Sequence, residues 1–189
     1  MLQIDLSDRV AVVTGASGQL GRVMARTVAR CGAAVAIHYH RNEEQAELVR
    51  HDVEAQDVRG MVVQADITDA ASVIRMRDRI CATVGAPQIV VTKAVSQYRW
   101  TSILEQTVAD YEDQFRACVL QNVLMAQAFV PAMIAHNYGR IVAINTECAM
   151  QNFATQSAYV AGKRGMDGVL RVLAKEIGSP AVPLIAGRW

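Results

Sequence analysis

The sequence lacks a charge excess, a closely spaced cysteine pair and a long uninterrupted apolar run. Its 19 basic and 18 acidic residues leave a formal net charge of +1, which gives no electrostatic footprint for nucleic acid or an anionic membrane. Cys31, Cys81, Cys118 and Cys148 include no Cys-x-x-Cys spacing, so neither a zinc motif nor a disulfide framework is expected, and no metal is predicted. We therefore expect small-molecule partners.

Signals for export and for membrane insertion are also missing. No basic stretch leads into an apolar run that ends in small residues, so a secretory signal is not expected. The most apolar helical segment, 118–133, is interrupted by Gln121, Asn122, Gln127 and Pro131, which makes it too polar and too short for a bilayer span. These features predict a cytoplasmic protein without membrane contact.

Short apolar runs alternate with helical patterns along the whole chain. At 189 residues and 52% apolar content, residues 1–189 are expected to form a single domain. Strands alternating with helices predict an α/β fold, a doubly wound parallel sheet of the Rossmann type with helices on both faces. The predicted strands are 9–14, 33–39, 61–65, 88–92 and 140–145, and the predicted helices are 20–31, 43–56 (capped by Asn42), from Thr68 or Asp69 to 83, 106–136 (bent near Pro131) and 157–177.

Residues 181–186 form a short candidate for a sixth strand, but Pro183 cannot donate a hydrogen bond to a neighbouring strand. We therefore expect six strands or fewer.

A glycine-rich turn, Thr14 to Gly21 (TGASGQLG), follows the first predicted strand and opens the first helix. Glycines at this spacing let backbone amides approach a pyrophosphate, while the helix directs its positive end at the phosphates. The position of the turn predicts dinucleotide binding, although a plain tight turn is the alternative. The candidate cofactor-binding residues are Gly15, Ser17, Gly18, Leu20 and Gly21.

The residues after the second and third strands bear on how the dinucleotide is held. A carboxylate after the second strand would bind the ribose hydroxyls and a cation would bind a 2′-phosphate. No acid precedes Glu43 there, so NADP(H) is preferred, with NAD(H) as the alternative. Arg41 is the predicted phosphate ligand, or else a solvated charge. His38 and His40 are expected at the rim, not as metal ligands. Asp66 is expected to accept from the adenine amino group, or else to cap the next turn.

Tyr159 and Lys163 lie one helical turn apart in the segment SAYVAGK. Residues four apart share a helix face, so the ammonium is expected close to the phenol. A phenol titrates near ~10 and exchanges protons poorly at neutral pH unless a cation favours its ionised form. The pair therefore predicts proton exchange beside a bound nicotinamide, and the alternative is a surface Tyr next to a solvated Lys.

With these motifs in this order, almost the whole chain resembles the short-chain dehydrogenase/reductase family, in particular its 3-oxoacyl-thioester reductases. The resemblance implies that Tyr159 exchanges the proton, that Lys163 lowers the phenol pKa and binds the nicotinamide ribose, and that a hydroxyl polarises the carbonyl. Thr146, thirteen residues before Tyr159, stands where the family has Ser. Threonine keeps the donor, and its extra methyl group is expected to restrict the substrate range.

Several positions depart from the family pattern. Thr92-Lys93-Ala94-Val95 stands in place of Asn-Asn-Ala-Gly, and the helix Asn that holds a relay water in the family falls on Cys118, with Asn122 one turn later. By the same resemblance, the last helix and strand of the family are expected to be absent. These departures leave two hypotheses besides an NADP(H)-dependent oxidoreductase of ketones and secondary alcohols: a catalytically weak or inactive dinucleotide-binding sensor or oligomer partner, and a fragment of a longer enzyme.

The resemblance also implies a homodimer or homotetramer. In the family, helices equivalent to 106–136 and 157–177 pack against their mates, and both segments are apolar on more than one face.

Overall fold

The computed structural model describes residues 4–177 and the backbone of residues 184–187. Its described strands form one parallel sheet of six strands in the order β3-β2-β1-β4-β5-β6. The strands are β1 (Val10–Val13), β2 (Ala34–Tyr39), β3 (Gly60–Gln64), β4 (Ile89–Thr92), β5 (Arg140–Ile144) and β6 (Leu184–Gly187). The predicted doubly wound α/β fold is confirmed. The sixth strand begins at Leu184, and the predicted residues 181–183 lie outside the described part of the chain.

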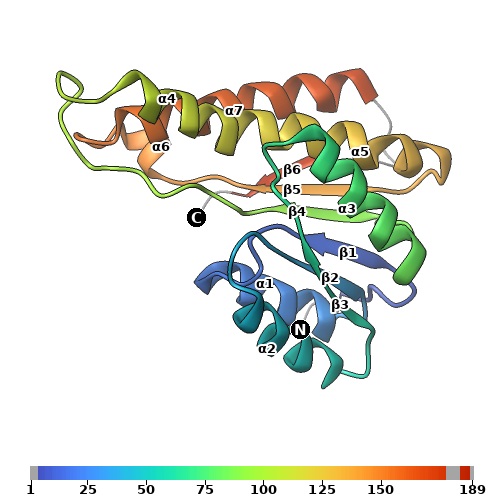
Figure 1. The fold of residues 1–189 in the computed structure, drawn as a ribbon. Coiled ribbons are helices and arrows are strands. Elements are labelled where there is room, and N and C mark those ends of the chain that lie inside the picture. The colour runs from blue at the N-terminus through green and yellow to red at the C-terminus, as the bar shows by residue number, and fades with distance from the viewer. Residues whose placement is uncertain (1–3, 178–183, 188–189) are drawn as a thin grey trace.

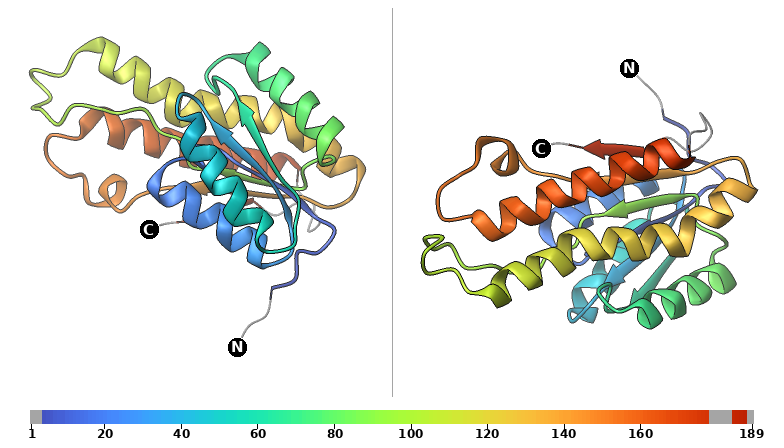
Figure 2. Two further views of the ribbon diagram at one scale, coloured as in Figure 1. Left: turned by 60° about the horizontal axis from the view of Figure 1, so that its bottom comes forward. Right: turned by 90° about the horizontal axis from the view of Figure 1, so that it is seen from above.

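Helices cover the two faces of the sheet in separate layers (Figure 1). On one face, α1 (Gln19–Arg30) and α2 (Glu43–Glu54) bury small apolar side chains such as Ala25 and Val49 against β1 and β2. On the other face, α3 (Ala70–Thr83), α5 (Gln121–Ala135) and α7 (Ser157–Ile177) lie side by side, as the view from above in Figure 2 shows. Their inward side chains, including Met76, Phe129 and Met166, form the larger core cluster.

Side-chain caps fix where α2 and α3 begin. The Asn42 side-chain oxygen accepts from the Gln45 amide at 2.9 Å, as predicted, and the Asp69 carboxylate accepts from the Ser72 amide at 2.6 Å. Such caps satisfy amides that the first helical turn leaves without partners. Asp69, not Thr68, is therefore the cap of α3.

The predicted continuous helix 106–136 is wrong in one respect. It is divided into α4 (Val108–Phe115), a π-helical segment η1 (Arg116–Leu120) and α5. The Asn122 side-chain amide donates to the Cys118 carbonyl at 2.7 Å, and the Gln121 amide donates to the Ala117 carbonyl. These side chains bond carbonyls within η1, so the interruption lies there, whereas α5 continues through Pro131.

The run Val108–Ala135 is long and apolar enough to cross a membrane by length and composition, with a mean hydropathy of 1.6 in its most apolar window. However, 61% of that window is buried inside the fold, where Met125 and Phe129 pack in the core. Burial against the protein's own sheet accounts for part of its apolar character.

Candidate functional site

The strand order places a cavity at the carboxyl edge of the sheet. β1 and β4 are neighbours, and the helices that follow them cover opposite faces, which opens a crevice where ligands of such sheets bind. A cavity of about 800 Å³ lies there, lined by the glycine turn, by residues that follow β2, β3 and β4, and by Asp113, Arg116 and Ala117. Its volume is typical of small-molecule sites.

The glycine turn is packed too tightly for side chains at two positions. Gly15 has a φ of +63°, a conformation that favours glycine. A Cβ at Gly21 would lie 2.2 Å from the Gly15 carbonyl oxygen. The helix that follows starts at Gly18 without any side-chain cap and has no acid in its first turn. Its first amides are therefore available to an anion.

The buried His38 side chain is hydrogen-bonded to this turn. Its side chain is 1% exposed; Nδ1 accepts from the Gly15 amide at 3.0 Å and Nε2 donates to the Ala65 carbonyl at 3.1 Å. Burial lowers the pKa of His38 to about 4, so the ring is neutral at physiological pH. The expectation of a surface or rim position is wrong for His38, because its ring is buried beneath the turn. His38 and the exposed His40 both line the cavity.

Five of the seven predicted residues of the turn and its surroundings line the cavity together: Gly15, Ser17, Gly18, Arg41 and Asp66. The other two, Leu20 and Gly21, do not line it.

Arg41 and Asp66 differ in whether their side chains have hydrogen-bond or ion-pair partners among the described residues. Arg41 is exposed and makes no hydrogen bond or ion pair with any described residue. The Asp66 carboxylate accepts from the Thr68 amide at 2.9 Å and the Thr68 hydroxyl at 2.7 Å, and these bonds lower the pKa of Asp66. Asp66 thus caps a turn, which was one of its two predicted roles, and it also lines the cavity.

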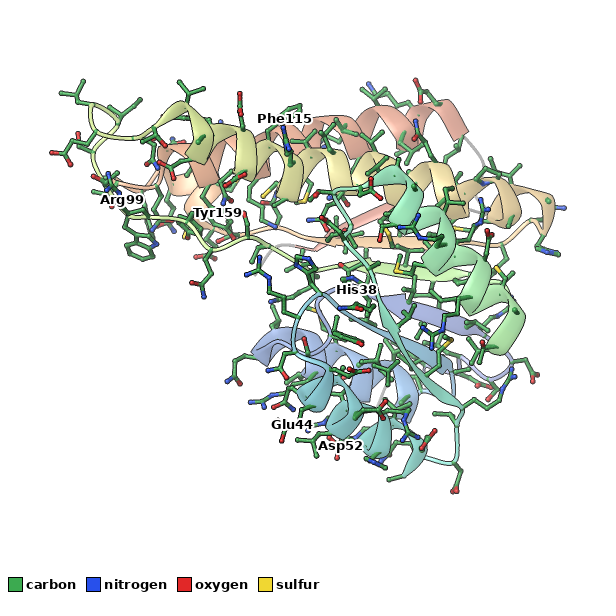
Figure 3. The ribbon with its side chains drawn as sticks, in the orientation of Figure 1. His38, Glu44, Asp52, Arg99, Phe115 and Tyr159 are labelled. Carbon is green, nitrogen blue, oxygen red and sulfur yellow. The ribbon has the colours of Figure 1, made fainter. Side chains whose placement is uncertain are left out.

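Tyr159, Lys163 and Thr146 come together beside this cavity, although none of the three lines it. The Lys163 ammonium lies 5.8 Å from the centre of the Tyr159 ring and donates to the Ile144 carbonyl at 2.6 Å. Thr146 follows β5 and lies near enough to the phenol to lower its pKa through a hydrogen bond. Figure 3 shows Tyr159 on the α4–α7 side of the sheet.

The phenol pKa runs opposite to the prediction. Burial, together with the neighbouring Tyr98, Cys118 and Cys148, raises the pKa of Tyr159 to about 12, because removing a phenolate from water is costly. Burial also lowers the pKa of Lys163. The sequence places the ammonium correctly, but the environment keeps the phenol neutral.

Two aromatic residues beside Tyr159 were not anticipated. The Tyr98 ring stacks on the Tyr159 ring with centroids 4.4 Å apart, and Trp100 stacks on Tyr98 at 6.3 Å. Both belong to the loop between β4 and α4, with Trp100 66% exposed. The spacing Tyr-x-Trp is the only sequence signal for this stack of aromatic rings.

Two of the positions that depart from the family pattern, Thr92 and Cys118, are joined by hydrogen bonds through Asn122. Thr92 donates from its hydroxyl to the Asn122 side-chain oxygen at 2.6 Å, and Asn122 donates in turn to the Cys118 carbonyl. The Cys118 thiol donates to Gln114 at 3.8 Å, and burial raises the pKa of that thiol. Within the described residues, no cluster of three or more His, Cys, Asp or Glu side chains could hold a metal ion.

A parallel sheet, a glycine turn at its switch point and a Tyr-Lys pair beside the cavity define a dinucleotide-dependent oxidoreductase fold. Residues 9–186 match the family model described as short chain dehydrogenase, so the chain belongs to the short-chain dehydrogenase family. The members of this family are oxidoreductases that act on CH–OH or C=O groups.

Individual relatives are distant in sequence and close in structure. The chain is 28% identical to a short-chain type dehydrogenase/reductase of Picea abies, covering 91% of this chain and 66% of that protein. It is 29% identical to a 3-oxoacyl-(acyl-carrier-protein) reductase of Pseudomonas aeruginosa, covering 97% of this chain and 73% of that enzyme. A metagenomic short-chain oxidoreductase crystallised with NADP superimposes with a TM-score of 0.90 at 26% identity, over 97% of this chain and 82% of that chain.

Proposed function

We propose that this protein is an NADP(H)-dependent oxidoreductase that reduces a ketone or oxidises a secondary alcohol. The observation that carries the proposal is the position of Tyr159, Lys163 and Thr146 next to a cavity built on the glycine turn. NADP(H), when bound, supplies or accepts the hydride. The residues of the chain then have to bind the dinucleotide, orient the carbonyl and move one proton.

The cavity residues fit a dinucleotide. The uncapped start of α1 at Gly18 offers amides to the pyrophosphate, and Asp66 faces the cavity where an adenine amino group would be bound. Arg41 is unpaired among the described residues, and no acid occurs between it and the end of β2, which supports NADP(H) over NAD(H). The relative crystallised with NADP is consistent with this preference.

Tyr159 is suited to give a proton. With a pKa of about 12 the phenol is protonated at neutral pH, so it can donate to the carbonyl oxygen as negative charge develops there. Thr146 donates a hydrogen bond to the same oxygen, and Lys163, fixed by the Ile144 carbonyl, holds the nicotinamide ribose. This state of the phenol favours reduction over oxidation near neutrality.

Fluorescence titration with NADPH and NADH, followed by a panel of ketones, tests the proposal. We expect NADPH to bind more tightly than NADH, and Tyr159→Phe to lower kcat/KM by about 10²- to 10⁴-fold without changing the NADPH affinity. Tyr138→Phe is the matched control, because that ring lies at the opposite end of β5, under the guanidinium groups of Arg9 and Arg140. The proposal is wrong if wild type binds neither nucleotide.

Cys118 supports a second function, a dinucleotide-binding sensor with little turnover. The thiol stands at the position of the relay Asn and is a weak donor and acceptor, while the Cys118 carbonyl is already bonded to Asn122. Tight NADPH binding with no turnover of any ketone, and no effect of Tyr159→Phe, would favour the sensor over the reductase.

We propose in addition that the protein is a homo-oligomer through the helices in 106–136 and 157–177. An apolar groove of about 600 Å³ runs between α5 and α7, with Val130, Pro131 and Leu173 among its lining residues. Val172, on the groove side of α7, is 55% exposed. In a two-fold dimer the same surface of each copy packs against its mate, and an exposed apolar helix face is suited to such a contact.

Sedimentation velocity at micromolar concentration tests the oligomer. We expect wild type to sediment as a dimer or tetramer and Val172→Glu to shift it toward monomer, since the interface would bury an unpaired charge. Val23→Glu is the control, because Val23 is 52% exposed on α1, away from the groove. A wild-type protein that is monomeric at these concentrations would contradict the proposal.

A further inference from the structure

We propose that Lys93 is a ligand of the cofactor pyrophosphate, a role for a side chain at the second position of the segment Thr92-Lys93-Ala94-Val95. The inference rests on the proposed function, since it requires a bound dinucleotide. Its basis is that Lys93 extends from the end of β4 to the glycine turn, within the same cavity.

The backbone of Lys93 is anchored to the turn. The amides of Lys93 and Ala94 both donate to the Thr14 hydroxyl, at 3.0 and 3.1 Å. Thr14 is completely buried and is the first residue of the glycine turn. These two hydrogen bonds fix the start of the loop after β4 against the turn. The Lys93 side chain therefore extends from a backbone that is held in place.

The ammonium lies directly over the turn. Lys93 Nζ is 3.3 Å from the point where a Cβ would stand on Gly18, the N-cap residue of α1. The amides at this helix start face an anion site. A cation at this distance can bond the same phosphate oxygens that the amides bond, which distinguishes it from Arg41, placed after β2.

Nothing in the described part of the chain neutralises this cation. Lys93 makes no ion pair or hydrogen bond through Nζ there, and neither Asp66 nor Asp113, the acids that line the cavity, is paired with it. Burial lowers its pKa, and Lys93 adds to the lowering of the pKa of Lys163. A partly desolvated cation beside the start of α1 is stabilised by a doubly charged anion such as a pyrophosphate.

A set of binding titrations separates the pyrophosphate from the other parts of the cofactor. Lys93→Met is expected to raise the Kd for NADPH, NADH and ADP-ribose by a similar factor of about tenfold or more, while Arg41→Met raises only that for NADPH. Lys175→Met is the matched control, because Lys175 is the exposed lysine at the end of α7. The affinity for adenosine, which has no phosphate, is expected to stay the same.

Each other pattern overturns the inference in its own way. If Lys93→Met weakens the binding of NADPH alone, Lys93 lies at the 2′-phosphate. If the variant also binds adenosine more weakly, the role of Lys93 is structural. If no affinity changes, Lys93 is not a ligand of the cofactor. If wild type itself binds neither NADPH nor NADH, it is the proposed function that fails, not the assignment of Lys93 alone.

A measurement on the wild-type side chains covers the case in which Lys93→Met does not fold. The chain has three lysines, Lys93, Lys163 and Lys175, so ¹³C-dimethylated protein gives few side-chain signals. Addition of ADP-ribose is expected to shift the Lys93 signal and to raise the pH at which it titrates, with the Lys175 signal unmoved. A Lys93 signal that does not respond to saturating ADP-ribose would overturn the inference.

Discussion

Replacing Gly21 with alanine tests the idea that the glycine turn must close tightly to form the cofactor site. The new Cβ would lie 2.2 Å from the Gly15 carbonyl oxygen, 2.8 Å from the Gly15 carbonyl carbon and 2.9 Å from Ala16 Cα. These are backbone atoms that cannot rotate away. The turn therefore has to open by about 1 Å before ordinary van der Waals contact is restored.

The expected change in the free energy of unfolding of Gly21→Ala follows from two opposing effects. Overpacking in a rigid environment costs about 1–3 kcal/mol, and the upper part of that range applies to a clash with backbone. Gly21 lies in the first turn of α1, so alanine regains up to about 1 kcal/mol of helix propensity. The net loss of about 2 kcal/mol corresponds to a Tm lower by about 4–8 °C for a chain of this length.

Gly18→Ala is the control within the same turn. Gly18 has ordinary extended backbone angles (φ −82°, ψ 167°), and its new Cβ would approach only the Gly15 oxygen and the movable Lys93 ammonium, both at 3.3 Å. We expect its stability to change by less than about 0.5 kcal/mol. Thermal melting by circular dichroism gives the readout, and NADPH titration is expected to show the Kd of Gly21→Ala raised about tenfold or more over wild type. Equal Tm values for the two variants would refute the reasoning.

Two further predictions concern Tyr159 and the packing of α7. The phenol pKa is raised to about 12, and reduction needs the protonated phenol. The kcat/KM for reduction at saturating NADPH should therefore show no loss assignable to Tyr159 between about pH 6 and 10. A fall in kcat/KM with a midpoint near pH 8 would contradict the raised pKa. Gly162→Ala should lower the stability by about 1–2 kcal/mol, because its Cβ would lie 2.9 Å from the Gln114 carbonyl oxygen and 3.2 Å from Cys118 Cβ. Gly165→Ala, which meets only a Val119 methyl group at 3.0 Å, should be nearly neutral in urea unfolding, and equal effects would show that α7 can move freely.

The sequence predicts the fold well because the fold is encoded by local patterns. Apolar runs with glycine or polar breaks place strands β1 to β5 within one or two residues, and the predicted helix over 157–177 has the observed bounds. The Asn42 cap and the glycine turn are likewise local signals. Local patterns therefore also place Tyr159 and Lys163 four residues apart on one helix.

Contacts between distant segments could not be predicted in the same way. His38 reaches Gly15 and Ala65 because β2 lies between β1 and β3, an arrangement that the residue alone does not reveal. The stack of Tyr98 on Tyr159 joins the β4 loop to α7. That stack and the burial around it reverse the expected direction of the phenol pKa, since a helical spacing gives the distance to Lys163 but not the loss of solvent.

The positions that depart from the family pattern are adapted to one another. Thr92 donates to Asn122, and Asn122 donates to the Cys118 carbonyl, so the carbonyl within the π-helical segment has a partner from the chain itself. The small Cys118 side chain also leaves room for α7, because its sulfur lies 3.3 Å from where a Cβ would stand on Gly162. An Asn restored at position 118 would press on α7 and compete with Asn122. These departures therefore act as a set, in which position 118 offers a buried thiol and no side-chain amide for a proton relay to Tyr159.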